Sequence, residues 1–144
     1  MVQILGFIYA LLAAITWGLI YALDEKILIK TSPLIFMFVN CLVGTILLLP
    51  FILFDPQPIK SLIHSDKTTL TLVLLSTVLG VCASIFIFCA IQKLGASTAS
   101  IFEICYPFFV MFFCYLLFQT NLNFYFFVGS VMMFLGSFVI IKFS

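Results

Sequence analysis

The sequence contains no arginine and a single histidine, and only 8% of its 144 residues are charged. A soluble domain of this length carries roughly a quarter of its residues as charged side chains, so this chain cannot cover a water-facing surface. The six lysines and five acidic residues leave a net charge of +1, and no basic patch indicates a nucleic-acid partner. These absences exclude an ordinary soluble protein and a nucleic-acid-binding protein.

Catalytic and metal-binding motifs are also missing. The single histidine, His64, lies in a polar loop beside Asp66 and Lys67, where we expect a solvated side chain. No Ser-His-Asp set, phosphate-binding loop or dinucleotide fingerprint is present. The five cysteines lie in apolar runs, match no zinc spacing and are odd in number, so we expect free thiols. The sequence therefore predicts a protein that is not an enzyme and holds no metal or cofactor.

The sequence contains long runs of hydrophobic residues instead. Hydrophobic residues make up 65% of the chain, 19 of them phenylalanine, and the mean hydropathy is +1.38. Five apolar stretches reach the roughly 20 residues that a helix needs to cross a bilayer. Lipid leaves each backbone amide to be satisfied within its own span, which predicts helices. We expect an all-α integral membrane protein with one five-helix domain over residues 1–144, its helices at about 3–23, 33–54, 69–92, 97–118 and 122–142.

The connections and the lysines predict how these spans are arranged. The short connections after the third and fourth spans predict that the last three spans form one compact unit. The first span lacks a basic leader and a cleavage site, so it is a retained span and not a signal peptide. Lysines on the C-terminal face outnumber those on the other face by four to two: Lys26, Lys30, Lys93 and Lys142 against Lys60 and Lys67. This favours a multi-pass protein of the cell (inner) membrane with a cytoplasmic C-terminus, and the small bias also permits dual topology.

Glu103 is an acidic residue inside the fourth predicted span, about 7 Å from the bilayer midplane at 1.5 Å per residue. An ionised carboxylate at that depth costs a few kcal/mol unless a partner, water or a proton compensates. Helical spacing puts it on one stripe with Ser100 and Pro107, which predicts that it faces the protein interior or a wet cavity. Pro107 removes the amide partner of the Glu103 carbonyl and predicts a helix break. Two interpretations stay open: Glu103 binds a cationic substrate or a coupling proton, or it is a neutral acid hydrogen-bonded to neighbouring helices.

Aromatic and polar residues in other spans are further candidates for the wall of a cavity. Trp17 and Tyr21 follow Ala14 on one stripe of the first span, and Trp17 lies too deep to be an interfacial anchor. Their roles are open between substrate contact and core packing. Asn40 is the only strongly polar group deep in the second span, where it lines the cavity or bonds to another helix. Tyr106 directly precedes the proline.

Small residues predict helix packing at three glycines. Gly80 belongs to a stripe of small residues in the third span, and such stripes let helices approach closely. Gly129 and Gly136 are seven residues apart in the fifth span and share a face, as do Ser130 and Ser137. We expect a packing seam there, within one chain or between subunits.

Several segments resemble the EamA-type members of the drug/metabolite transporter superfamily. They are AAITWGLIYAL at 13–23, TSPLIFMFVNCLVGTILLLP at 31–50, LGVCASIFIFCAIQKLGASTASIFEICYPFFVMFFCYLLF at 79–118 and FVGSVMMFLGSFVII at 127–141. The residues that match one by one are Trp17, Gly18, Gly95, Pro107, Gly129 and Gly136. Many relatives carry glutamates where this chain has Tyr106 and Gln119, and an arginine near Val39–Asn40. The resemblance therefore does not carry over the transport site.

The resemblance implies a fold and a function. Full-length relatives have ten helices in two inverted repeats, so this chain resembles one repeat, and alternating access needs two. It implies a homodimer, antiparallel or parallel, or a complex with a separate partner chain. The function implied is secondary transport of a small organic metabolite or drug, and Glu103 is the candidate residue for coupling it to protons. Its cavity would be lined by Trp17, Tyr21, Asn40, Glu103 and Tyr106. The alternatives are a lipid-linked sugar flippase and a non-transporting scaffold subunit.

Overall fold

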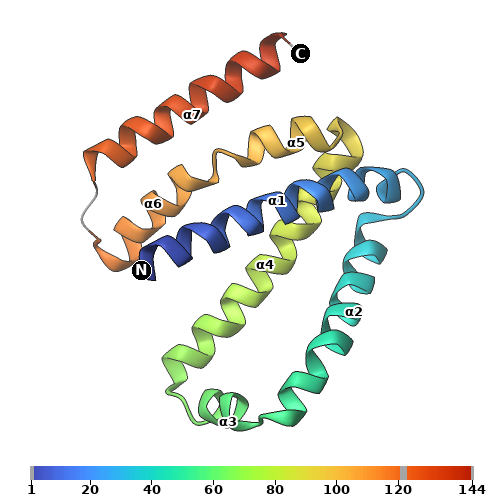
Figure 1. Cartoon of the computed structure of the whole chain (residues 1–144), viewed down its shortest axis with the longest axis vertical. Helices are drawn as coiled ribbons and strands as arrows, with labels where there is room; N and C mark the ends of the chain where they lie inside the picture. Colours follow the sequence, from blue (N-terminus) through green and yellow to red (C-terminus); the bar gives the residue numbers. More distant parts are fainter. Residues whose placement is uncertain (1, 121–122, 144) are drawn as a thin grey trace. The chain divides into compact units, whose positions relative to one another are not determined.

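The computed structural model describes residues 2–120 and 123–143, and over these ranges the chain folds only into helices (Figure 1). A helix is the expected form for so apolar a chain, because it satisfies its own backbone amides. The helices are α1 (Val2–Leu28), α2 (Pro33–Phe54), α3 (Gln57–Ile63), α4 (Lys67–Leu94), α5 (Ala96–Glu103), α6 (Tyr106–Phe118) and α7 (Phe124–Phe143).

Within the described residues, five segments are long and apolar enough to cross a membrane. Their lengths of 20 to 28 residues match the roughly 20 residues that a bilayer core requires. The fourth segment consists of two helices, α5 and α6, and α3 is a short helix in the longest connection. The predicted all-α membrane fold with five spans is thereby confirmed. The segments are Ile4–Leu28, Pro33–Phe54, Lys67–Leu94, Ala96–Phe118 and Phe124–Phe143.

The first helix is longer than the sequence predicts. It continues to Leu28, although the prediction ends it near residue 23 and leaves Asp24 in a polar connection. Asp24 is only 3% exposed and Leu28 is fully buried, and a hydropathy pattern does not show this burial. The predicted start of the fifth span at residue 122 lies outside the described residues, and α7 begins at Phe124.

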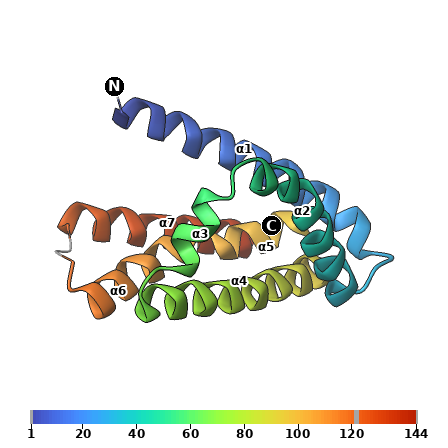
Figure 2. The same ribbon diagram turned by 90° about the horizontal axis from the view of Figure 1, so that it is seen from below.

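The chain divides into two compact units, residues 1–23 with 94–144, and residues 24–93. In the second of these, α2 and α4 run in opposite directions and α3 joins them (Figures 1 and 2). The rings of Phe36 and Phe88 pack with centroids 4.9 Å apart, and Ile91 is 1% exposed. The side-chain nitrogen Nε2 of Gln92 donates to the Leu28 carbonyl oxygen at 2.8 Å, which satisfies a carbonyl at the C-terminal end of α1.

These contacts correct one prediction about how the spans are grouped. The sequence predicts that the last three spans form one compact unit, but α4 groups with α2 and not with α5, α6 and α7. The reason lies in the last turns of α4, where Phe88 and Gln92 contact the start of α2 and the turn before it. The single five-helix domain stays a prediction.

In the unit formed by residues 1–23 and 94–144, α7 packs along both α5 and α6 (Figures 1 and 2). Gly95 alone separates α4 from α5, and its φ of 81° with ψ of 160° is a conformation that essentially only glycine adopts. α6 ends where Gln119 takes a left-handed φ of 51° and its amide donates to the Tyr115 carbonyl oxygen at 2.9 Å. Helices commonly end with a left-handed residue that makes this hydrogen bond. The residue is usually glycine, whereas here it is glutamine.

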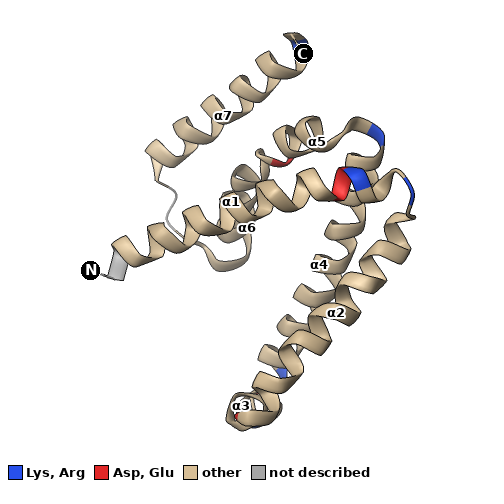
Figure 3. Cartoon of the chain, turned by 45° about the vertical axis from the view of Figure 1, so that its right-hand side comes forward, with Lys and Arg blue, Asp and Glu red and all other residues tan. Residues whose placement is uncertain are grey.

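Charged residues lie at the ends of helices and in connections, with one acidic position at the junction of α5 and α6 (Figure 3). That position is Glu103, the last residue of α5. Among the described residues it is the only Asp, Glu or Lys away from the end of a span. The fold thus places one carboxylate at membrane depth.

Candidate functional site

The fourth span is interrupted just before its proline. α5 ends at Glu103, and α6 begins at Tyr106 with Pro107 in its first turn. Proline is well tolerated in a first turn because the amides there lack intrahelical partners. The sequence predicts the break at Pro107, whereas the structure places it at Ile104 and Cys105, two residues earlier. The break follows from the missing Pro107 amide, which would otherwise donate to the Glu103 carbonyl.

The break itself is a tight turn. The Cys105 amide donates to the Phe102 carbonyl oxygen at 3.3 Å, and the Phe108 amide donates to the Cys105 carbonyl oxygen at 3.2 Å. Both bonds span three residues, as in a 3₁₀-helix, and such turns inside a helix often mark functional positions. Glu103 therefore lies at the end of a half-helix within the membrane.

Glu103 is hydrogen-bonded to the first helix. The hydroxyl of Tyr21 donates to Oε2 of Glu103 and joins α1 to the end of α5. Tyr21 is 9% exposed, and its ring meets the Trp17 ring edge-on with centroids 5.9 Å apart. A carboxylate that needs a compensating partner at this depth thus has a donor from a neighbouring helix.

These residues line a hollow of about 430 Å³, which we call the acidic hollow, formed by Ala14, Trp17, Tyr21, Glu103 and Tyr106. The three residues from α1 follow a spacing of three and four, which puts them on one helix face. Its volume lies within the range of small-ligand sites, about 300–1,000 Å³. Tryptophan and tyrosine rings attract cations over their faces, and a carboxylate holds a proton or a cationic group. The acidic hollow is therefore suited to a small molecule that carries a positive charge, or to a proton.

The acidic hollow is open in a single chain. Trp17 is 55% exposed and Tyr106 is 61% exposed, and Glu103 is also exposed. The structure shows that the carboxylate of Glu103 reaches Tyr21 of α1, and its place in the protein interior or a wet cavity stays a prediction. Ser100 takes no part, because its hydroxyl donates to the Ser97 carbonyl oxygen at 2.9 Å.

Four of the five predicted site residues, Trp17, Tyr21, Glu103 and Tyr106, share the acidic hollow. Asn40 is an exposed residue of α2 and belongs to the other unit, so its place in the site stays a prediction. Ala14 also lines the hollow, and the sequence placed it on the stripe of Trp17 and Tyr21 without naming it as a site residue. Its spacing from Trp17 and Tyr21 was the available signal.

The predicted packing glycines lie on open surfaces. A Cβ atom built on Gly80, Gly129 or Gly136 meets no atom within 4 Å. Among the described residues of one chain, no neighbouring helix therefore approaches these glycines closely, and in α7 the buried residues are Ser130 and Ser137 instead. Close packing at the glycines stays a prediction for a contact between subunits.

The described residues contain no group of three or more His, Cys, Asp or Glu side chains that suits a metal ion. The five cysteines are free: Cys41, Cys82, Cys89, Cys105 and Cys114. The lining of the acidic hollow offers one carboxylate, two phenol hydroxyls and aromatic rings.

Comparison with known proteins identifies the family. The model of the EamA-like transporter family matches residues 4–142, from the first candidate span to the last. No curated protein and no solved structure matches the chain. A transporter family of this kind implies a lipid bilayer and a small-molecule substrate, in agreement with five apolar spans and a hollow at membrane depth. The chain belongs to the EamA-like transporter family and is a multi-pass membrane transporter of the drug/metabolite transporter superfamily.

Proposed function

We propose that the chain is a secondary-active transporter of a small organic molecule, with the acidic hollow as its binding site. The observation that carries the proposal is the hydrogen bond from Tyr21 to Glu103 within a membrane-spanning unit. Intramembrane carboxylates are expensive and are functional by default. Aromatic rings beside this carboxylate favour a substrate with a cationic group.

Glu103 couples transport to protons in this proposal. A single carboxylate holds either a proton or the positive charge of a substrate, so the two compete for it. The Glu103 carboxyl releases its proton to one face of the membrane as the substrate binds. After the substrate leaves, the carboxylate recovers a proton from the opposite face. The open position of Glu103 supports this role, because both ligands need access to it.

The functional form is a dimer. Alternating access needs two repeats around a central site, and this chain supplies five spans. The acidic hollow is open in one chain, with Trp17 and Tyr106 more than half exposed, so a second copy is needed to enclose a substrate. The small lysine bias permits the two copies to insert oppositely in the cell (inner) membrane, which gives an antiparallel homodimer.

Substitution of Glu103 tests the proposal. Glu103→Gln keeps the shape of the side chain and its hydrogen bond with Tyr21 but removes the acid group that would hold a proton or a cationic substrate. In proteoliposomes with an imposed pH gradient, we expect it to abolish uptake of organic amines that the parent protein accumulates. Glu25→Gln is the matched control, because it removes an acid of α1 that does not line the acidic hollow. Uptake by Glu103→Gln that equals the parent's at every pH contradicts the coupling role.

Two further measurements separate the proposal from its rivals. Translocation of labelled lipid-linked sugars without a pH gradient identifies a flippase. A purified chain that binds and transports nothing, and that co-purifies with a stoichiometric partner, identifies a scaffold subunit. Accessibility of cysteines introduced at both termini in cells tests the dimer, since a single fixed orientation excludes the antiparallel form.

A further inference from the structure

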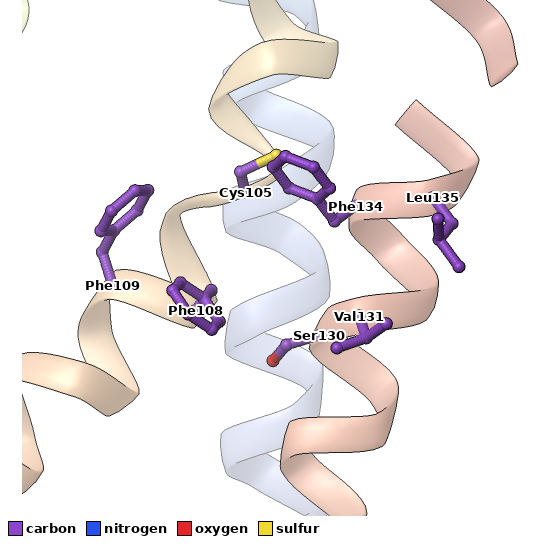
Figure 4. A pocket seen from close by; sticks show the side chains of 7 residues that line it. All are labelled: Cys105, Phe108, Phe109, Ser130, Val131, Phe134 and Leu135. Atoms are coloured by element: carbon purple, nitrogen blue, oxygen red, sulfur yellow. The ribbon is translucent and has the colours of Figure 1, made fainter. Parts of the chain in front are cut away.

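A second hollow, the lateral pocket, lies between α6 and α7 beside the helix break (Figure 4). Its volume is about 290 Å³. Cys105 of the break and Phe134 of α7 point toward each other, and Phe108 faces Ser130 across the pocket (Figure 4). The lateral pocket shares no lining residue with the acidic hollow, so it is a separate site.

The lateral pocket exists because a small residue lies opposite the helix break. Ser130 is 4% exposed, and its hydroxyl donates to the carbonyl oxygen of Phe126 at 2.9 Å, one turn back on its own helix. The hydroxyl is therefore already bonded within α7, and the short side chain leaves space in front of Phe108. The break at Cys105 interrupts the regular surface of the facing span, which leaves room that neither helix fills.

The lining suits hydrocarbon and not water. Apart from the Ser130 hydroxyl, which is already bonded, and the Cys105 thiol, a weak donor, its side chains are apolar. A buried water typically makes about three hydrogen bonds, and apolar cavities of about 150 Å³ stay dry and bind benzene. The lateral pocket has about twice that volume, enough for a longer hydrocarbon segment. If the pocket were empty, the side chains that line it would lack dispersion contacts on that side.

The lateral pocket is continuous with the lipid-facing surface. Phe109, Phe134 and Leu135 line it and are each more than half exposed in membrane-spanning segments. Cys105 is the tenth residue of the 23-residue span Ala96–Phe118, so the pocket lies near the middle of the hydrocarbon core. At this depth the surrounding bilayer offers acyl chains and no headgroups.

We infer that the lateral pocket binds one acyl chain of a bilayer phospholipid, which inserts between α6 and α7 at the level of the helix break. Three features identify an acyl chain as the occupant: the apolar lining, the position at the depth of the acyl chains and the continuity with the protein–lipid interface. The bound acyl chain makes van der Waals contacts with Phe108 and Phe134 that the interrupted span does not provide. This inference does not depend on the transport function, because no residue is shared with the acidic hollow.

Photo-crosslinking tests the inference. The protein is placed in phosphatidylcholine nanodiscs that contain a small fraction of a phosphatidylcholine with a diazirine in the middle of one acyl chain. After irradiation, adducts are located by peptide mass spectrometry. We expect adducts to be enriched at Cys105, Phe108 and Phe134 over Phe138, which is as exposed as Phe134 at 60% but does not line the pocket. Equal labelling of Phe134 and Phe138 overturns the inference. Fewer adducts at the pocket residues than at Phe138, as expected if a second copy covers the pocket, also overturn it.

Two pairs of variants provide the controls. Ser130→Leu fills the lateral pocket and should abolish the enrichment. Ser137→Leu is matched to it, since Ser137 is 6% exposed and bonds to the Met133 carbonyl oxygen at the same 2.9 Å, but it lies outside the pocket. If Ser130→Leu does not fold, Phe134→Ala decides instead. It removes a wall at an exposed position and should lower labelling of Cys105, whereas Phe138→Ala should not, and unchanged labelling in Phe134→Ala overturns the inference.

Discussion

Replacing Tyr21 by phenylalanine removes the hydroxyl that donates to Glu103 and leaves the ring beside Trp17. Hydrogen bonds between membrane helices contribute about 0.6 kcal/mol on average and about 1.7 kcal/mol at most in double-mutant cycles. Bonds to charged groups are stronger, about 1.5–3 kcal/mol in soluble proteins. We therefore expect the free energy of unfolding to fall by about 1.5 kcal/mol, roughly a tenfold change in the equilibrium constant.

The assay is reversible unfolding in mixed detergent micelles, followed by tryptophan fluorescence. Trp17 is the single tryptophan and lines the acidic hollow, so its signal reports on the site itself. A double-mutant cycle with Tyr21→Phe and Glu103→Ala isolates their interaction, and we expect a coupling of about 1–1.7 kcal/mol. Tyr125→Phe is the control, because Tyr125 is 82% exposed and lies outside the site. Effects that add to within about 0.5 kcal/mol refute the hydrogen bond as a stabilising contact.

Two predictions concern the connections. Gly95→Ala should destabilise the protein by about 1–3 kcal/mol, because alanine is strained at φ 81° and ψ 160°; an unchanged unfolding midpoint refutes the turn geometry. Asp66 accepts hydrogen bonds from the hydroxyl and the amide of Thr69, which lower the pKa of its carboxyl. These hydrogen bonds stabilise the folded state. The stabilisation is complete above the unfolded pKa of about 3.9 and is lost as pH falls through the lower folded pKa. Asp66→Ala should therefore lower the melting temperature at pH 7, and the difference from the parent should shrink below about pH 4.

The spans were predictable because hydropathy alone determines them. A run of about 20 apolar residues has few alternatives to a membrane helix, and the predicted ranges 33–54 and 97–118 agree with Pro33–Phe54 and Ala96–Phe118. The end of α1 was not predictable in this way. Asp24 has the polarity of a connection, yet it lies within α1 and is only 3% exposed.

The acidic hollow was predictable in part. Periodicity places Trp17 and Tyr21 on one face of α1, and depth singles out Glu103, but each is a property of one helix. The bond between Tyr21 and Glu103 joins residues 82 positions apart and depends on how α1 packs against α5. The lateral pocket is harder still, since it arises from a small side chain, Ser130, opposite a backbone irregularity on another helix. No periodic pattern encodes such a coincidence.

The division of the fourth span has a consequence for biogenesis. α5 has 8 residues and α6 has 13, so they extend about 12 Å and about 20 Å at 1.5 Å per residue. Neither reaches across a hydrocarbon core of about 30 Å, so neither half can integrate as an independent stop-transfer segment. The insertion machinery must accept residues 96–118 as a single unit, with the apolar α6 carrying the acidic end of α5 into the bilayer. A nascent chain released before α6 is complete would leave Glu103 at the aqueous boundary and the acidic hollow unassembled.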